Sequence, residues 1–408
     1  MSHGNKNIAV ICAPQPDRNT GMFTVDLSAF SYMQKNYPDC NVSYYVFSDK
    51  DERQYSAQEQ PFAYKNIIKD AKEFLASDVF LYWGDFIHSN TYWELDMKFL
   101  EHGLDKSANA ELKKKHEDRL NNRKKLIFLN EMTKEALKRV IVFGSTIITN
   151  EAADVKSVAY TKEFDYFFRN IGNVYFRDAL SAAKISPMRG SEATLACDCA
   201  FLLENSDFNK LPGFKLADKR QDVGVFFGRS SSKLSMMIFS KLLGCYSGQK
   251  CVWLPWFIST PKMTKVAKLF GYNVPKDHLS PSELLSALSG YKFVVTDTYH
   301  MCINAWRMGV PAICIGQGDA TASNSIADKK KEILYEMYGA RPFYIFLGSL
   351  TSVFKQLRTA KAVAKVVEDE ILINAVIDNI QSHRAMALER LNTALTRALS
   401  ISSAKEAA

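Results

Sequence analysis

Residues 293–311 read FVVTDTYHMCINAWRMGVP, and this stretch decides the fold class. The apolar run at 293–296 has the composition of a buried strand, and the polar residues after it lead into a helical pattern. Ligands of doubly wound α/β folds bind where such strands end. The stretch therefore predicts an α/β sheet with Asp297 and His300 at its ligand-binding edge. An imidazole there can exchange a proton at neutral pH, although a lone histidine after a strand is more often structural.

The same strand-and-helix unit recurs along the chain, where short apolar runs alternate with amphipathic stretches in the pattern of parallel sheets. We expect strands at residues 7–13, 42–47, 79–83, 125–129, 140–143, 173–176, 222–227, 250–254, 293–296 and 312–315. We expect helices at residues 23–34, 65–76, 131–139, 233–243, 281–288 and about 360–399.

The chain is long enough for two domains, because its 408 residues exceed the size at which one hydrophobic core stops growing. Residues 204–221 are rich in Asn, Asp, Pro, Gly and Lys and resemble a linker. We therefore predict an α/β fold with two Rossmann-like doubly wound domains, at 1–205 and 206–359. They face a cleft, and a long helix within residues 360–408 packs back across them.

The composition, 47% hydrophobic and 24% charged, is that of a packed globular protein. No stretch approaches the roughly 20 apolar residues of a spanning helix, so a cytoplasmic location is expected. The net charge of +8 favours anionic ligands or an anionic surface. Residues 113–125 form a basic helical segment, either a solvated face or a contact with the inner face of the membrane. No aromatic residues are interleaved with these charges, so a nucleic-acid partner is not expected.

The eight cysteines are scattered and predict no disulfide framework. Cys197 and Cys199 form a C-x-C pair, but no second Cys or His pair lies nearby at zinc-ligand spacing. Clustered carboxylates at a strand end are also missing, so the sequence predicts no metal site and metal-independent chemistry.

Four motifs follow one another in order over residues 10 to about 317. They are Asn19-Thr20-Gly21, the run Val174-Tyr175-Phe176-Arg177-Asp178, the segment Asp198-Cys199-Ala200-Phe201, and Thr296-Asp297 with His300, Gly309 and Pro311. Together they resemble the polysaccharide pyruvyltransferase family, whose motifs are an Asn-x-Gly loop, a strand with Arg-Asp, an Asp-Pro-Ala-Phe segment, and Thr/Ser-Asp-Arg-Leu-His followed by Gly-x-Pro.

The resemblance implies a GT-B-like architecture and transfer of pyruvate from phosphoenolpyruvate to sugar hydroxyls as a ketal. The acceptor would be a polysaccharide or its lipid-linked precursor, and no cofactor is implied besides the donor substrate. Such chemistry needs an acid that protonates the enol carbon and fixed cations that hold the carboxylate and phosphate. Carried over by position, His300 would be the acid/base or the phosphate-facing donor, and Asp297 would orient the turn or a neighbouring side chain.

The chain departs from the family where Arg and Leu are expected, because Thr298 and Tyr299 stand there. A Thr hydroxyl cannot replace the charge of an Arg fork on a carboxylate or phosphate. Another cation must do the work, or the donor is different.

Three residues are candidate donor-binding cations together with Thr298 and Tyr299. Arg229 and Lys233 lie in a turn that opens a helix, where backbone N–H groups favour an anion, although a solvated helix cap explains them equally. Arg177 matches the Arg-Asp position but could form a structural pair with Asp178. Arg307, on the helix after His300, is expected to face elsewhere.

Residues after two strands of the first half are predicted to bind the acceptor. They are Asn19, Gly21, Gly84 and Asp85, with Asp85 and His88 as candidate hydroxyl bases; the two glycines are equally well ordinary turn residues. Trp253 and Trp256 could form a sugar-stacking platform or belong to a buried aromatic cluster.

Two other functions fit the same fold. One is a glycosyltransferase that uses a nucleotide sugar, with Thr298 and Tyr299 lining a base or ribose pocket. The other is an inactive relative that binds glycan or scaffolds a polysaccharide-assembly complex. Nothing in the sequence indicates the acceptor sugar or the oligomeric state.

Overall fold

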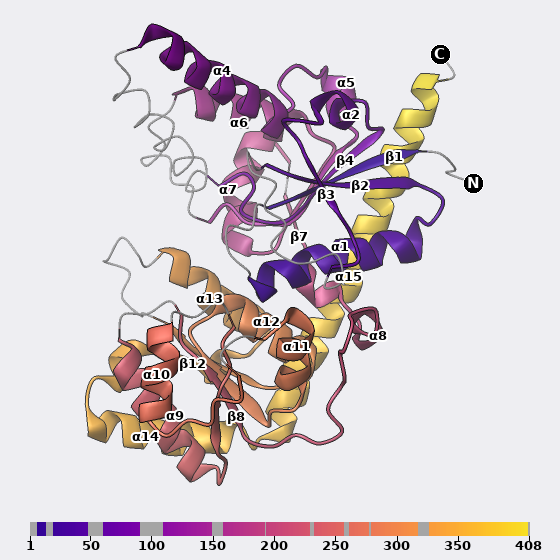
Figure 1. Cartoon of the computed structure of the whole chain (residues 1–408). Helices are drawn as coiled ribbons and strands as arrows, with labels where there is room; N and C mark the ends of the chain where they lie inside the picture. Colours follow the sequence, from indigo (N-terminus) through magenta and orange to yellow (C-terminus); the bar gives the residue numbers. More distant parts are fainter. Residues whose placement is uncertain are drawn as a thin grey trace.

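Two parallel β-sheets, each flanked by helices, make up the protein (Figure 1). The structure is a computed structural model and describes residues 6–13, 19–47, 60–89, 109–148, 158–191, 193–228, 232–256, 261–276, 279–316 and 326–406. The predicted α/β class with two Rossmann-like sheets and a long C-terminal helix is confirmed. The domain limits at 205 and 359 stay predictions.

The first sheet has seven parallel strands in the order β3-β2-β1-β4-β5-β6-β7. They are β1 (Asn7–Cys12), β2 (Asn41–Val46), β3 (Tyr64–Asn66), β4 (Val79–Asp85), β5 (Val140–Ser145), β6 (Asn173–Phe176) and β7 (Thr194–Leu195). The second sheet has five parallel strands in the order β12-β11-β10-β8-β9. They are β8 (Val223–Phe226), β9 (Cys251–Trp253), β10 (Phe293–Thr296), β11 (Ala312–Gly316) and β12 (Tyr344–Phe346). Both orders reverse beside a first strand, which is the doubly wound arrangement.

Helices cover both sheets and the junction between them. The helices before the second sheet are α1 (Thr20–Asn36), α2 (Ala71–Leu75), α4 (Ala110–Ile127), α5 (Lys134–Leu137), α6 (Val158–Asn170), α7 (Ala179–Arg189), η1 (Cys199–Leu202) and α8 (Asn205–Phe208). The later ones are α9 (Lys233–Tyr246), α10 (Pro261–Leu269), α11 (Pro281–Ser289), α12 (Tyr299–Arg307), α13 (Ile326–Met337), η2 (Arg341–Phe343), η3 (Leu347–Leu350), α14 (Val353–Val366) and α15 (Glu370–Glu406).

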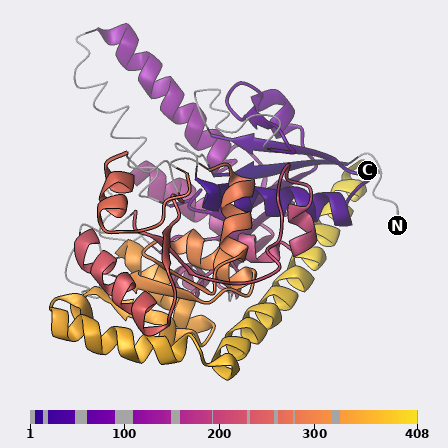
Figure 2. The same ribbon diagram turned by 60° about the horizontal axis from the view of Figure 1, so that its bottom comes forward.

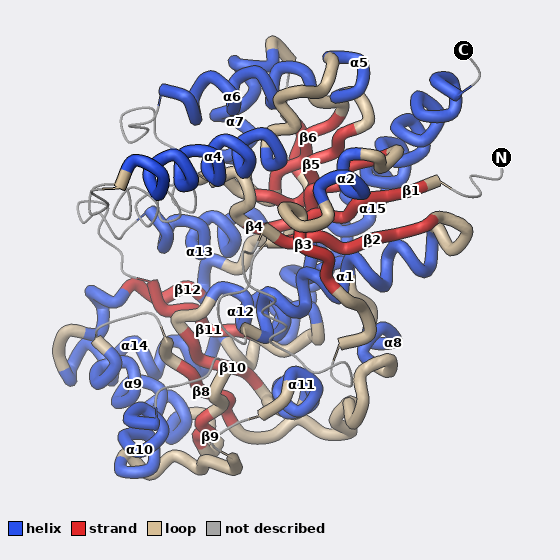
Figure 3. Tube along the Cα trace, turned by 45° about the horizontal axis from the view of Figure 1, so that its top comes forward, coloured by secondary structure: helices blue, strands red, loops and turns tan. Residues whose placement is uncertain are grey.

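The first sheet is buried on both faces, as the alternation of side chains along β4 shows. Leu81 and Trp83 belong to a core that continues into the second sheet, whereas Phe80 and Tyr82 belong to a separate core under α4, α6 and α7. Because successive side chains point to opposite faces, two apolar layers can share one strand. Figure 3 shows α1 and α15 on the opposite side of this sheet from α4 and α6.

The long helix α15 connects the two halves of the molecule, and Figure 2 shows it as a single rod that runs beside both sheets. Near its start the Asn379 amide donates to the carbonyl of Tyr338, next to α13. Near its end Ser402 donates to Asp78, which directly precedes β4. Side-chain hydrogen bonds near its two ends therefore attach α15 to both halves of the molecule.

Two predicted elements of the first half are wrong. Residues 125–129 are the end of α4 and the turn after it, because a short apolar run does not distinguish a strand from a buried helix end. The predicted helix at 65–76 is instead β3, a turn and the short helix α2. The Asn66 side chain accepts from the N–H groups of Ile68 and Lys69, which ends the strand in a local turn.

The C-terminal prediction needs a correction as well. The expected helix at 360–399 is split between α14 and α15, since Asp369 interrupts the run and its side chain accepts from the N–H of Leu372. Strands β3, β7 and β12 are not among the predicted strands; each has only two or three residues, which give a weak alternation. Among the described residues, no helix combines the length and apolarity needed to cross a membrane.

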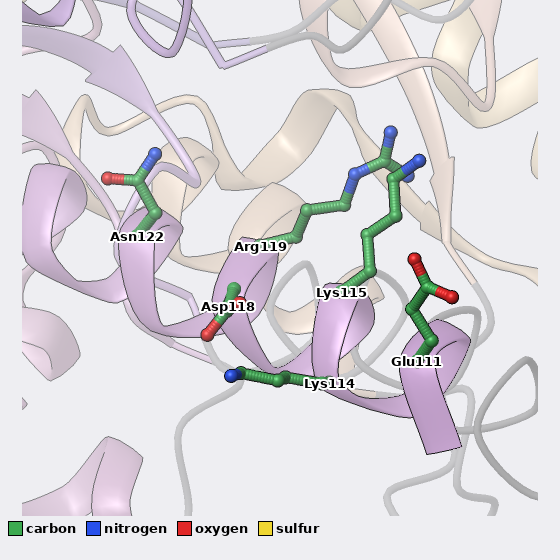
Figure 4. Close-up of a pocket in the computed structure, with 6 residues that line it drawn as sticks. All are labelled: Glu111, Lys114, Lys115, Asp118, Arg119 and Asn122. Atoms are coloured by element: carbon green, nitrogen blue, oxygen red, sulfur yellow. The ribbon is translucent and has the colours of Figure 1, made fainter. Parts of the chain in front are cut away.

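The basic segment 113–125 lies within α4, as predicted. Figure 4 shows a hollow along this helix that is lined by charges of both signs, with Lys115 and Arg119 extending in the same direction. Its lining residues are Glu111, Lys114, Lys115, Asp118, Arg119 and Asn122. A contact between this face and a membrane stays a prediction.

Candidate active site

The carboxyl ends of both sheets meet at one cluster of charged side chains. Asp85 ends β4, Arg177 follows β6, and Tyr299 and His300 open α12 after β10. Asp198 comes after β7 and caps η1 by accepting from the N–H of Ala200. The carboxyl-end edges of the two sheets, where ligand binding is predicted, therefore face each other.

Arg177 is the centre of this cluster and is 4% exposed. Its Nη1 lies 2.8 Å from Oδ2 of Asp198, and its Nη2 lies 3.7 Å from Oδ1 of Asp85. The Tyr299 ring centroid is 4.7 Å from the guanidinium carbon. Within the described part of the chain, the Nη2 group donates no hydrogen bond, so it could donate one to a bound carboxylate or phosphate.

The environment keeps Arg177 charged and Tyr299 neutral. Burial by itself would lower the pKa of Arg177, but the neighbouring carboxylates Asp198 and Asp85 act against it and the net pKa is raised. Burial also raises the pKa of Tyr299 well above its ordinary value, so the tyrosine stays protonated. The carboxylates therefore supply the negative charge beside Arg177 at neutral pH.

His300 lies where α12 crosses α1. Its Nε2 is 3.9 Å from Oδ2 of Asp198, the same oxygen that Arg177 contacts. A Cβ atom added to Gly21 would come within 2.2 Å of the His300 Cβ atom, so only glycine permits this approach. The Asn304 amide bonds both the His300 carbonyl and the Thr24 hydroxyl, which fixes the crossing of the two helices. The predicted residues Gly21 and His300 are thus brought together.

Asp297 accepts two hydrogen bonds at the turn before α12, and an orienting role in catalysis stays a prediction. Its Oδ1 accepts from the N–H of Gly228 at 2.8 Å and from the Thr298 hydroxyl at 3.3 Å. Gly228 follows β8, so this carboxylate joins the ends of two adjacent strands. Thr298 is thereby directed at Asp297 and brings no charge to the site.

The other predicted ligand residues are more scattered. Lys233 is half-buried at the start of α9, and Arg229 lies outside the described residues. Asn19 caps α1 by accepting from the N–H of Gly21 at 3.0 Å. Gly84 and Asp85 are both buried and have left-handed backbone, with Asp85 turned to Arg177. Acceptor binding by these residues stays a prediction.

His88 is not an acceptor base in this structure. Its ring is 1% exposed and packs among aromatic residues, with centroids 4.6 Å from Tyr82 and 4.8 Å from Phe167. Burial lowers the pKa of His88 to about 3. Position after a strand suggested the wrong role, because the ring packs against Phe128, Phe167 and Phe168 in the aromatic core.

This burial predicts a pH dependence of stability. The folded state keeps His88 neutral, whereas the unfolded state takes up a proton below the ordinary pKa of 6.5. The stability is therefore full above pH 6.5 and falls by up to roughly 1.4 kcal/mol per pH unit as the pH is lowered toward 3. The variant His88→Phe should lose this component, measured as urea unfolding at pH 7.5 and 5.0. The half-buried His383 is the matched control, whose replacement should change the pH slope less. Equal slopes in wild type and His88→Phe would contradict the assignment.

Two aromatic residues and one arginine lie away from the cluster. Trp253 and Trp256 are completely buried, so they form the aromatic core of the second sheet and no sugar platform. Arg307 lies over the ring of Phe208 and contacts the carbonyl of Leu203, and thus faces elsewhere as predicted.

Two residues of the site were assigned no role from the sequence. Asp198 belongs to a quoted motif, yet only the fold brings its carboxylate to both Arg177 and His300. Lys330 lies in a run of three lysines on α13, and its Nζ is 4.5 Å from the Phe86 ring centroid. The sequence could have indicated Asp198, because it belongs to a motif that follows a strand. It could not have indicated Lys330, because a run of lysines does not show which of them enters a site. Among the described residues, no three His, Cys, Asp or Glu side chains are grouped to hold a metal ion.

Comparison with solved structures defines the class of the fold. A Listeria monocytogenes protein described as a UDP-N-acetylglucosamine 2-epimerase superposes with a TM-score of 0.55 and 9% identity, over 92% of this chain and 91% of the other. The UDP-GlcNAc 2-epimerase from Neisseria meningitidis superposes with a TM-score of 0.53 and 11% identity, over 95% of this chain and 100% of the other. At these identities the likeness shows the fold alone, which is the GT-B-like arrangement of two Rossmann-like halves.

The sequence assigns the chain more narrowly. It matches the model of the polysaccharide pyruvyl transferase family over residues 27–319, which include Arg177, Asp198 and His300. The chain belongs to this family and is a transferase. No curated protein matches it in sequence.

Proposed function

We propose that the protein moves a pyruvyl group from phosphoenolpyruvate to two hydroxyls of a glycan, or of its lipid-linked precursor, as a ketal. The observation that carries the proposal is the shared contact of Arg177 and His300 with Asp198 where the two sheets meet. An anion-binding cation and a proton donor are the two groups that this reaction requires.

His300 is the proposed proton donor. Protonation of the methylene carbon of phosphoenolpyruvate turns it into a methyl group and leaves positive charge on the neighbouring carbon and its oxygen. The first sugar hydroxyl adds to that carbon and gives its proton to the imidazole. The carbon–oxygen bond to phosphate then breaks, the second hydroxyl adds, and its proton leaves with the phosphate. One donor and one diol thus give one ketal and one phosphate.

In the proposed donor site, Arg177 binds the carboxylate of phosphoenolpyruvate. Lys233 and Arg229 are further candidate cations, and the ring of Tyr299 lines the site. Asp297 and Thr298 support the turn that presents His300. Asn19, Gly21, Gly84 and Asp85 remain the proposed acceptor side. With a lipid-linked acceptor, the reaction would take place in the cytoplasm at the inner face of the membrane, with α4 as the contact.

The proposal is tested by calorimetry and by phosphate release. Purified protein should bind phosphoenolpyruvate in preference to UDP or CMP, and it should release phosphate when a glycan acceptor is added. Arg229→Ala should weaken the binding if that residue supplies a donor cation. Tighter binding of a nucleotide than of phosphoenolpyruvate would overturn the proposal in favour of a glycosyltransferase, and no turnover with any donor would favour a glycan-binding role.

A further inference from the structure

Arg177 cannot hold a doubly charged donor by itself, because its charge is already opposed. Two carboxylates, Asp85 and Asp198, lie within 3.7 Å and 2.8 Å of its guanidinium. With both ionised, the formal charge of this group of three is −1. Even a protonated His300 brings the cluster only to zero. A donor with a carboxylate and a phosphate therefore needs another fixed cation at the site.

Lys330 lies at the required place. Its Nζ is 4.5 Å from the Phe86 ring centroid and 5.3 Å from that of Tyr299. The Arg177 guanidinium carbon is 5.2 Å and 4.7 Å from the same two rings. The two cations therefore share one aromatic pair, although Arg177 follows β6 of the first sheet and Lys330 lies on α13 beside the second. Figure 1 shows α13, which carries Lys330, on the side of the second sheet that faces the first.

The different burial of Arg177 and Lys330 indicates from which side an anion would approach the two cations. Arg177 is buried, whereas Lys330 and Phe86 are half-buried and form the solvent side of the cluster. An ammonium group suits phosphate as a point charge, and an Arg fork suits the flat carboxylate. The phosphate, which leaves after the reaction, would then lie on the side that is open to solvent.

The neighbouring lysines lie elsewhere on α13 and do not contact the two rings in the described part of the structure. Lys331 is 4% exposed, pairs with Asp328 and donates to the carbonyl of Asp297, so its ammonium fixes α13 to the end of β10. Lys329 is exposed on the same helix. Among these three, Lys330 alone is directed at the cluster.

We propose that Lys330 binds the phosphate group of the donor and supplies the charge that Thr298 lacks. This inference rests on the proposed function for the identity of the donor, but the anion site itself does not. Phosphoenolpyruvate and inorganic phosphate are therefore used as separate probes.

The experiment compares Lys330→Met and Lys330→Arg with the matched control Lys329→Met. Loss of one charge-assisted contact should raise the Kd for phosphoenolpyruvate and its KM by about 10- to 100-fold, with the acceptor KM unchanged. Lys330→Arg keeps the charge and should therefore raise these constants less than Lys330→Met does. The Kd for inorganic phosphate should rise in parallel, and Lys329→Met should alter neither value. Thermal unfolding checks that all three variants are folded.

The outcomes separate the two proposals. If wild type binds phosphate through Lys330 but does not bind phosphoenolpyruvate, the anion site stands and the proposed donor is wrong. If wild type binds phosphoenolpyruvate and Lys330→Met binds it equally well, the role of Lys330 is wrong and the donor stands. If wild type binds neither probe, both proposals fail.

Discussion

Replacing His300 with alanine is expected to lower turnover at least about a hundredfold, because the variant has no group to protonate the methylene carbon of the donor. The histidine side chain is 10% exposed, and its Nε2 lies 3.9 Å from Oδ2 of Asp198. The measurement is the initial rate of acceptor-dependent phosphate release. His383→Ala removes a half-buried histidine from α15 and is the control. A rate near that of wild type in His300→Ala would end the assignment.

The packing around His300 allows a second test that keeps the imidazole. In Gly21→Ala the new methyl group would lie 2.2 Å from the His300 Cβ atom, so either the histidine or α1 must shift. Turnover and thermal stability should both fall, since overpacking forces such displacements. Gly348→Ala is the matched control, because a Cβ atom there meets nothing within 4 Å. Unchanged turnover in Gly21→Ala would show that the close approach of α1 has no part in catalysis.

The strand and turn at residues 293–300 could be read from the sequence because every local signal agrees there. β10 occupies the predicted residues 293–296, and β6 likewise occupies 173–176. Apolar runs that are bounded by polar turns define such buried strands. Residues 125–129 show where this kind of strand prediction fails, since Phe128 is equally buried but follows a helix.

The site was predictable only as separate strand ends. The sequence places Arg177, Asp85 and His300 each after a strand, but it carries no information on which ends meet across the two sheets. The contact of Asp198 with both Arg177 and His300, and the approach of Lys330 to Phe86, depend on how α1, α12 and α15 hold the halves together. Local sequence patterns predict which face of an element is buried and where a strand ends. The contacts between residues of the two halves depend on how the whole sheets pack together.

Arg177→Met is expected to cause the largest loss, in both activity and stability. The change leaves Asp85 and Asp198 buried without their cation, and breaking a buried pair in this way costs about 3–5 kcal/mol. Denaturant unfolding measures the stability, and donor binding should be lost in the fraction that folds. Lys35→Met is the control, because the Lys35–Glu204 pair is exposed and its loss should cost at most about 1 kcal/mol.

Three further measurements separate charge from packing at Arg177. Arg177→Lys keeps the charge and should recover part of the stability without the activity, since an ammonium cannot reproduce the fork. Adding Asp198→Asn to Arg177→Met should also recover stability, because it removes one of the uncompensated charges. The stability gap between Arg177→Met and wild type should narrow from pH 8 to pH 5, because the folded variant gains by taking up a proton on a buried carboxylate. A pH-independent gap, with no recovery in the double variant, would mean that Arg177 acts through its packing against Tyr299 and Phe86 and that its charge is not what the fold requires.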